Sequence, residues 1–225
     1  EEDFLQALTK EIDIIFLCNP NNPTGLLVEK PLLEKILKRC QELDILMAVD
    51  ECFLDFVPSP EKYTLKEYLE TYDNLFLLKA FTKRYAMAGV RLGYGLCGNK
   101  GLLEKIEGVC QPWNVSSMAQ AAGLAALQET EYVEKGRQVT FQELAYLKEE
   151  LTALGYPVYP SQANYVFFTG PADLYEKLEQ KKILIRDCSN YTGLSKGYYR
   201  VAVKKHEENQ QLVRALKEIE RNRKK

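Results

Sequence analysis

The sequence is poor in the side chain that many catalytic sites use, because it contains a single histidine, His206, among its 225 residues. His206 opens a polar helical stretch far from the motifs described below, which argues against a serine–histidine catalytic pair and against a metal site of several histidines. None of the six cysteines forms a C-x-x-C pair, and most lie in apolar patterns. We therefore predict buried or idle thiols in a reducing compartment, and no disulfide framework or zinc site.

An excess of one charge and long apolar runs are missing as well. The chain has 30 basic and 32 acidic side chains, so nothing predicts a nucleic-acid or membrane surface. The apolar stretches are short and interrupted by charge, so no signal peptide or membrane span is predicted. These absences predict a cytoplasmic protein that binds neither nucleic acid nor membrane.

What is present in the first half is an alternation of short apolar runs and helical patterns, which predicts a parallel sheet covered by helices. The predicted strands are 12–17, 45–49, 75–78 and 91–97. A helix is predicted to begin at Pro31, and the alanine-rich stretch 116–127 is predicted to form a buried helix.

The second half begins with a long amphipathic pattern from about residue 131 to 154, which Gly155 ends. The segments that follow are a strand at 165–168, a helix at 172–180, strands at 183–186 and 198–203, and a helix from residue 207. We predict two domains, a large α/β domain at residues 1–130 and a small α+β domain with its linker helix at residues 131–225.

Three polar motifs each follow a predicted strand. They are C-N-P-N-N-P-T-G at 18–25, D-E-C-F at 50–53, and F-T-K-R-Y-A-M-A-G-V-R-L-G-Y at 81–94. Because parallel strands place their carboxyl ends at one edge of a sheet, the motifs are expected to share the edge where open α/β sheets bind ligands.

The third motif suits a phosphorylated cofactor with an aldehyde group. The amine of Lys83 would hold the aldehyde, while Thr82 and Arg91 would reach the phosphate. Taken alone, a lysine is more often a solvated surface residue. The neighbouring Arg84 is interpreted as a surface residue.

The first two motifs also have two interpretations each. Asp50 closes an apolar strand, and its carboxylate could keep a ring nitrogen protonated, although a turn or helix-capping aspartate would look the same. Asn22 could donate its amide to a ligand oxygen, although Asn-Pro turns are common. Three motifs in this order favour the functional interpretation of each.

Together the motifs resemble the fold-type I pyridoxal-phosphate enzymes, the aminotransferase class I and II superfamily. The resemblance extends to the last helix and implies the aminotransferase-like α/β fold with pyridoxal 5′-phosphate as cofactor. It implies that Lys83 carries the cofactor and moves protons. The other implied cofactor-binding residues are Asn22, Asp50, Phe53, Thr82 and Arg91.

The resemblance also implies a substrate site in the second half. Arg200 matches the superfamily's carboxylate-binding arginine, and Arg186 matches an arginine of the branches that act on phosphorylated substrates. Arginine presents two parallel donors that fit a carboxylate or a phosphate. Asn22 is expected to contact the substrate as well, and the expected partner is a small phosphorylated amino acid or amine.

The closest branches are threonine-phosphate decarboxylase of cobalamin synthesis and histidinol-phosphate aminotransferase. Phe53 favours the decarboxylase, because the aminotransferase branch usually has a tyrosine there, and so do the runs 111–116 and 185–194. A third alternative is a sensor domain of the aminotransferase type, fused to a DNA-binding module and without turnover.

The chain opens with a helical pattern that leads straight into the first strand, without an initiator methionine. We interpret it as lacking an N-terminal portion, which in the family supplies part of the phosphate site and contacts to a second subunit. The full-length protein is expected to be a homodimer, and these residues alone are expected to bind cofactor poorly and to be inactive.

Overall fold

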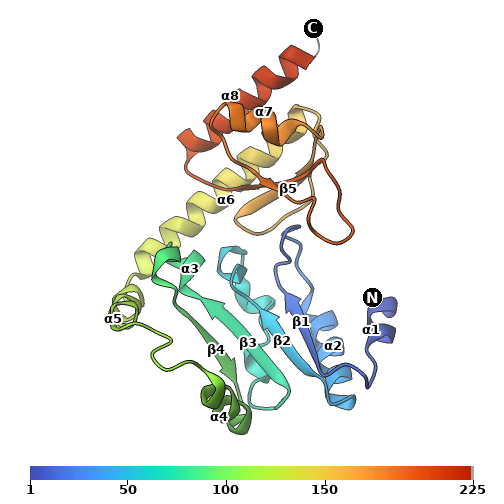
Figure 1. Ribbon diagram of the computed structural model, residues 1–225, viewed down its shortest axis with the longest axis vertical. Coiled ribbons are helices and arrows are strands. Elements are labelled where there is room, and N and C mark those ends of the chain that lie inside the picture. The colour runs from blue at the N-terminus through green and yellow to red at the C-terminus, as the bar shows by residue number, and fades with distance from the viewer. Residues whose placement is uncertain (224–225) are drawn as a thin grey trace. The chain divides into compact units, whose positions relative to one another are not determined.

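The computed structural model describes residues 1–223 (Figure 1). The chain divides into two compact units, which are described separately. The first consists of Glu1–Pro20 and Leu27–Val133, and the second consists of Asn21–Leu26 and the chain from Glu134 onward. Contacts thus group the short segment Asn21–Leu26 with the second unit, while the division into folding domains at residue 130 stays a prediction.

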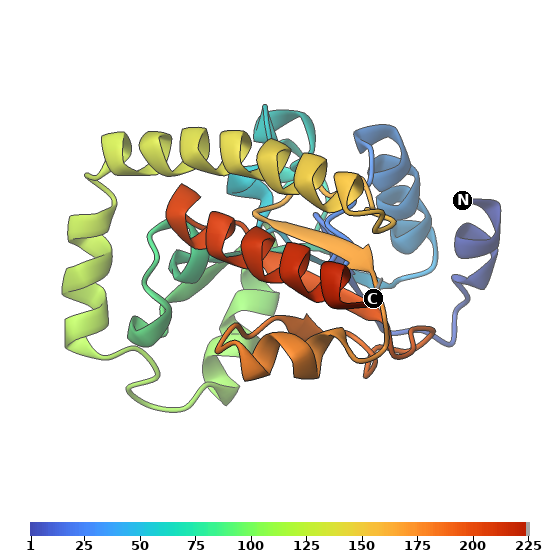
Figure 2. The ribbon, with the colours of Figure 1, turned by 90° about the horizontal axis from the view of Figure 1, so that it is seen from above.

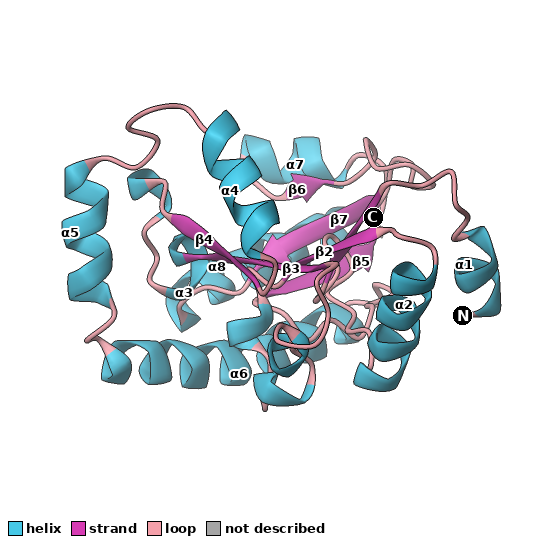
Figure 3. Ribbon diagram, turned by 90° about the horizontal axis from the view of Figure 1, so that it is seen from below, coloured by secondary structure: helices cyan, strands magenta, loops and turns pink. Residues whose placement is uncertain are grey.

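The first unit is built on a four-stranded sheet in the order β1-β2-β3-β4 (Figure 1). Figure 3 shows strands in magenta and helices in cyan. Its strands are β1 (Ile14–Cys18), β2 (Leu46–Asp50), β3 (Leu75–Ala80) and β4 (Gly93–Cys97). The first three strands are parallel, as predicted, but β4 runs antiparallel to β3.

The prediction of a wholly parallel sheet was therefore wrong at β4. A parallel crossover needs a dozen or more residues, usually a full helix. The segment between β3 and β4 contains only a four-residue helix, α3 (Phe81–Arg84), and a short 3₁₀ turn. The backbone N–H of Phe81 donates to the carbonyl of Leu92 at 3.1 Å, so the chain turns back beside β3.

Helix α2 (Lys30–Glu42) covers one face of this sheet. Pro31 lies in its first turn, where the missing N–H costs nothing. Its buried positions follow the spacing of one helical face and pack on apolar side chains of β2 and β3. They are Leu33, Ile36, Leu37 and Cys40.

The remaining helices of the first unit are α1 (Glu2–Ala7), α4 (Lys100–Val109) and α5 (Ser117–Ala126). Short 3₁₀ turns lie at Leu54–Phe56, Pro60–Lys62, Lys66–Tyr68 and Ala88–Val90.

Helix α5 differs from the buried helix that its alanine content predicts. Ala119, Gly123 and Ala126 face inward, but Met118 and Leu124 are 82% and 69% exposed. The small side chains suffice for close packing on one side, and the apolar residues on the other side have no cover among residues 1–223. The only tryptophan of the chain, Trp113, lies in the loop before α5 and is 96% exposed.

The second unit contains an antiparallel sheet in the order β5-β7-β6. Its strands are β5 (Tyr165–Thr169), β6 (Arg186–Asp187) and β7 (Tyr198–Ala202). Its helices are α6 (Thr130–Ala153), which belongs to this unit from Glu134 onward, α7 (Leu174–Gln180) and α8 (His206–Arg223), which Figure 2 shows from above. The predicted strand 183–186 is shorter than expected, because only Arg186 and Asp187 pair with β7.

A polar cluster joins α6 to the start of α8. The buried carboxylate of Glu143 lies 2.9 Å from Nδ1 of His206 and accepts a hydrogen bond from Nδ2 of Asn209 at 2.8 Å. Asn209 is itself buried and also donates to the carbonyl of Lys204. The single histidine thus has a structural position between two helices.

Among the described residues, no helix has the length and apolar content to cross a membrane.

Candidate functional site

Asp50 and Lys83 follow the ends of neighbouring parallel strands. Asp50 is the last residue of β2, and Lys83 lies in α3, three residues after the end of β3. Asp50 is in register with Leu78 of β3. The structure therefore places both residues at the carboxyl edge of the sheet, where parallel α/β sheets bind ligands.

The carboxylate of Asp50 shapes the turn that follows it. Its Oδ1 accepts a hydrogen bond from the backbone N–H of Cys52 at 2.9 Å. Burial above all, together with the hydrogen bond to Asp50 and the negative charge of Asp50, raises the pKa of the Cys52 thiol to about 12. The thiol therefore stays protonated at neutral pH and is a poor nucleophile.

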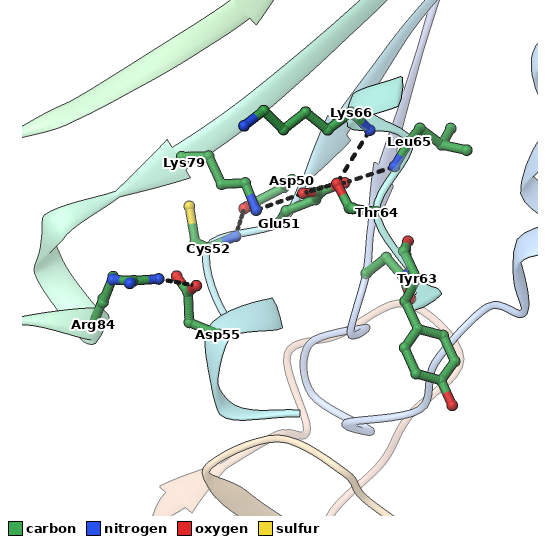
Figure 4. A network of polar contacts seen from close by, with 11 residues as sticks. Asp50, Glu51, Cys52, Asp55, Tyr63, Thr64, Leu65, Lys66, Lys79 and Arg84 are labelled. Atoms are coloured by element: carbon green, nitrogen blue, oxygen red, sulfur yellow. Dashed lines mark hydrogen bonds and ion pairs between the residues drawn. The ribbon is translucent and has the colours of Figure 1, made fainter. Parts of the chain in front are cut away.

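Of the four basic side chains in residues 79–91, two form ion pairs with carboxylates and two do not. Lys79 is paired with Glu51 at 2.6 Å, and Arg84 is paired with Asp55 (Figure 4). Among the described residues, neither Lys83 nor Arg91 forms an ion pair with a carboxylate. The two cations predicted to hold the cofactor are thus the two without an acidic partner, and both are exposed to solvent.

The local geometry of these residues fits a phosphorylated aldehyde. The amine of Lys83 lies 5.4 Å from the centre of the Phe53 ring. Arg91 has a left-handed backbone with φ of 58°, and its Nη1 donates to the carbonyl of Ala88 at 3.1 Å. Thr82 is half-buried beside Lys83 in α3. A free amine, a carboxylate and an unpaired guanidinium are the donor and acceptor types that pyridoxal phosphate requires.

Arg84 was interpreted as a surface residue, and its side chain is 38% exposed. Its guanidinium nevertheless contacts Asp55, and its Nε is buried. This pair was not predicted, because the two residues are 29 positions apart in the sequence.

In the second unit, the structure brings Arg186 and Arg200 together. They are cross-strand partners in the pairing of β6 with β7. Like charges directly opposite each other destabilise a sheet. Neither arginine forms an ion pair with a carboxylate among the described residues, so the pair presents uncompensated positive charge that suits an anionic ligand.

Asn22 lies beside Arg200 within the same unit. Its Oδ1 accepts hydrogen bonds from Nη1 of Arg200 and from the hydroxyl of Tyr191 at 3.4 Å. The guanidinium of Arg200 lies 5.0 Å from the centre of the Tyr165 ring. Because the oxygen of Asn22 is occupied, the amide nitrogen is the group it can offer to a ligand, and it can only donate.

Tyr191 is a contact residue that the sequence did not identify. Its ring centre lies 5.9 Å from the guanidinium of Arg186, whose Nη2 donates to Oδ1 of Asn190 at 3.0 Å. Tyr191 therefore contacts Arg186 through its ring and Asn22 through its hydroxyl. The run 185–194 contained this residue, but the pattern did not show which side chains would meet.

The turn that carries Asn22 requires a glycine at position 25. Gly25 has φ of +71°, and a Cβ built there would lie 1.8 Å from Oγ of Ser161. The backbone N–H of Gly25 donates to the carbonyl of Asn21 at 2.6 Å, which closes the turn around Asn22.

Substituting Gly25→Ala is expected to lower the free energy of unfolding by about 2–4 kcal/mol, because it adds steric overlap to an unfavourable φ. Gly193→Ala is the matched control, since Gly193 has φ of +84° but open space around an added Cβ. Urea unfolding followed by far-UV circular dichroism measures both. Equal losses in the two variants would contradict the proposed clash with Ser161.

The sequence model of the family described as "Aminotransferase class I and II" matches residues 2–216. Threonine-phosphate decarboxylase of Salmonella typhimurium is 37% identical over 219 residues, which cover 96% of this chain and 60% of that protein. Histidinol-phosphate aminotransferase of Methanosphaera stadtmanae is 32% identical over 228 residues, covering 98% and 60%. The chain thus spans about 60% of the length of these curated relatives.

A solved structure gives the same result for the fold. The histidinol-phosphate aminotransferase from Clostridium acetobutylicum matches with a TM-score of 0.92 and 32% identity, covering 98% of this chain and 67% of that one. The predicted α/β fold and superfamily are confirmed. The cofactor of this family is pyridoxal 5′-phosphate, and the chain belongs to the class I and II aminotransferases.

Proposed function

We propose that the protein is a pyridoxal-phosphate-dependent enzyme acting on a small phosphorylated amino acid or amine. The observation that carries this proposal is the cross-strand pair of Arg186 and Arg200, which no carboxylate neutralises among the described residues. Two guanidinium groups on one face offer paired donors for a phosphate and a carboxylate. A substrate with both groups would offset the repulsion between the two arginines.

The residues of the first unit have matching roles in holding the cofactor. When bound, pyridoxal phosphate supplies an electron sink for the bond broken at the substrate Cα. Lys83 would hold its aldehyde, and as a free amine it would move a proton at the substrate Cα. Asp50 would keep the proton on the ring nitrogen, because its negative charge stabilises the pyridinium form.

Two further sets of groups complete the cofactor contacts. The hydroxyl of Thr82 and the guanidinium of Arg91 would bind the phosphate. The amide nitrogen of Asn22 would donate to the phenolic oxygen of the cofactor, because Oδ1 of Asn22 already accepts from Arg200.

Within this class we rank decarboxylation of L-threonine O-3-phosphate ahead of transamination of histidinol phosphate. The bond broken at the substrate Cα would depend on how Arg186 and Arg200 orient the phosphate and the carboxylate of the substrate. Phe53 supports decarboxylation, because it lacks the hydroxyl that the aminotransferase branch usually presents. The relative with 37% identity is named as a threonine-phosphate decarboxylase, which also favours this ranking. No observation favours the sensor alternative.

The ranking is tested by offering the full-length protein both substrates. We expect release of carbon dioxide from L-threonine O-3-phosphate, and little turnover of histidinol phosphate with 2-oxoglutarate. A Lys83→Ala variant gives the background for both assays. Transamination without gas release would reverse the ranking, and activity on neither substrate would reject both.

We also propose a cytoplasmic homodimer. All six cysteines are free thiols, in keeping with a reducing compartment. The exposed apolar side chains of α5 offer a surface that a second copy could cover. Sedimentation equilibrium of the full-length protein measures the oligomeric state, and a monomer at micromolar concentration would contradict this proposal.

A further inference from the structure

Two segments of the first unit run alongside each other at the edge where Lys83 lies. Three contacts join them: Glu51 with Lys79, Phe53 with Lys83, and Asp55 with Arg84. The first segment follows Asp50, and its three contact residues, at positions 51, 53 and 55, are every second residue of the chain. The two ion pairs therefore lie on either side of the contact that Lys83 makes.

The first ion pair is deeply buried. The side chain of Glu51 has no exposed surface, and Lys79 is 16% exposed. The Thr64 hydroxyl lies 2.9 Å from both carboxylate oxygens of Glu51 and shares its one proton between them, and Oε1 also accepts from the backbone N–H of Leu65 at 3.3 Å (Figure 4). A buried carboxylate with this many donors has a fixed position, and removal of its cation leaves an uncompensated charge.

The second ion pair is less buried but also constrained. Asp55 is 19% exposed at its side chain, and Arg84 is 38% exposed. The guanidinium of Arg84 also lies 5.5 Å from the centre of the Tyr85 ring. Its orientation is therefore limited by Asp55 and by the neighbouring ring.

These pairs differ from other ion pairs of the first unit. Lys30–Glu67 at 2.7 Å and Arg39–Glu42 at 3.5 Å do not join the ends of β2 and β3. Glu51 directly follows Asp50, Lys79 lies four residues before Lys83, and Arg84 directly follows Lys83. Each pair thus joins a residue within five positions after Asp50 to a residue within four positions of Lys83.

We propose that Glu51–Lys79 and Asp55–Arg84 form a double clamp that positions the amine of Lys83 relative to the carboxylate of Asp50. The four clamp residues are positioning residues, because they act through Lys83 and Asp50 without contacting substrate. The clamp also neutralises the two cations nearest Lys83 in the chain. This inference rests on the proposed roles of Lys83 and Asp50 in binding pyridoxal phosphate.

The test uses the full-length protein titrated with pyridoxal phosphate. Borohydride reduction and peptide mapping give the fraction of Lys83 labelled, and the induced circular dichroism of the bound cofactor reports its orientation. Arg84→Met is expected to weaken labelling about tenfold at limiting cofactor and to reduce the dichroism. The exchanged pair Asp55→Arg with Arg84→Asp is expected to recover at least half of both signals.

Lys30→Met is the control, because it removes the cation of Lys30–Glu67, an ion pair of the same unit that does not join the ends of β2 and β3. It is expected to leave labelling and dichroism unchanged. Thermal unfolding of every variant shows whether it is folded. If Lys79→Met fails to fold, Lys79→Arg tests the buried pair, with labelling expected to stay near the unmodified level.

The clamp would be overturned if a folded Arg84→Met variant kept the labelling and dichroism of the unsubstituted protein. It would also be overturned if Lys30→Met lost as much labelling and dichroism as Arg84→Met. Failure of the cofactor assignment looks different. In that case the unmodified protein would bind pyridoxal phosphate without label at Lys83, and the inference would fall with the assignment on which it rests.

Discussion

Substituting Lys83→Ala is expected to abolish covalent attachment of pyridoxal phosphate and to lower turnover of the full-length protein by on the order of 10⁴-fold. In the proposed function the amine of Lys83 both holds the cofactor and moves protons, and loss of a positioned acid–base group alone costs about 10²–10⁴-fold. Borohydride reduction followed by peptide mapping measures the attachment. A label on another lysine, with covalent binding retained in the variant, would end the assignment of Lys83.

Lys105→Ala is a suitable control for this experiment. Lys105 lies in α4 of the same unit and is exposed, like Lys83. The control should retain labelling and turnover. Loss of both in the control would indicate a general effect of removing positive charge.

Substituting Arg200→Gln is expected to lower kcat/KM by about 10²–10³-fold. A bidentate bond between arginine and an anion contributes several kcal/mol, much of which is the cost of leaving the partner unpaired. Arg200→Lys keeps the charge but loses the paired donors, so an intermediate loss of about tenfold is expected. Steady-state kinetics with the phosphorylated substrate measures both variants.

Stability measurements separate this role from a structural one. Removing Arg200 relieves the repulsion with Arg186 while it breaks the contact with Asn22, so the free energy of unfolding should change by less than about 1 kcal/mol. Arg214→Gln, in α8 of the same unit, is the control and should leave kcat/KM unchanged. A large loss of stability in Arg200→Gln with unaltered kinetics would contradict a substrate-binding role.

The sequence predicted the elements of this fold better than their directions. The apolar runs before Asp50 and before Lys83 predicted the bounds of β2 and β3 to within a few residues, because buried parallel strands consist largely of apolar residues. The direction of β4 depends on how the segment after Lys83 turns, and a four-residue helix leaves no periodic signal. Likewise, alanine content predicted helix α5 but not which of its faces would be covered.

The candidate site shows a similar division. Motifs in the chain identified single residues such as Asn22, Asp50 and Lys83. Pairings between distant residues, such as Asp55 with Arg84 or Tyr191 with Asn22, were not predicted. Such contacts depend on strand register and loop geometry, which a single sequence does not reveal.

The exposure of Trp113 determines which optical probes can be used with this protein. As the only tryptophan, it dominates the intrinsic emission, and its nearly complete exposure means that the indole is already in water in the folded state. Its fluorescence will therefore change little when either unit unfolds. For the same reason, a blue shift of this emission would be a specific signal that another molecule has covered the loop between α4 and α5.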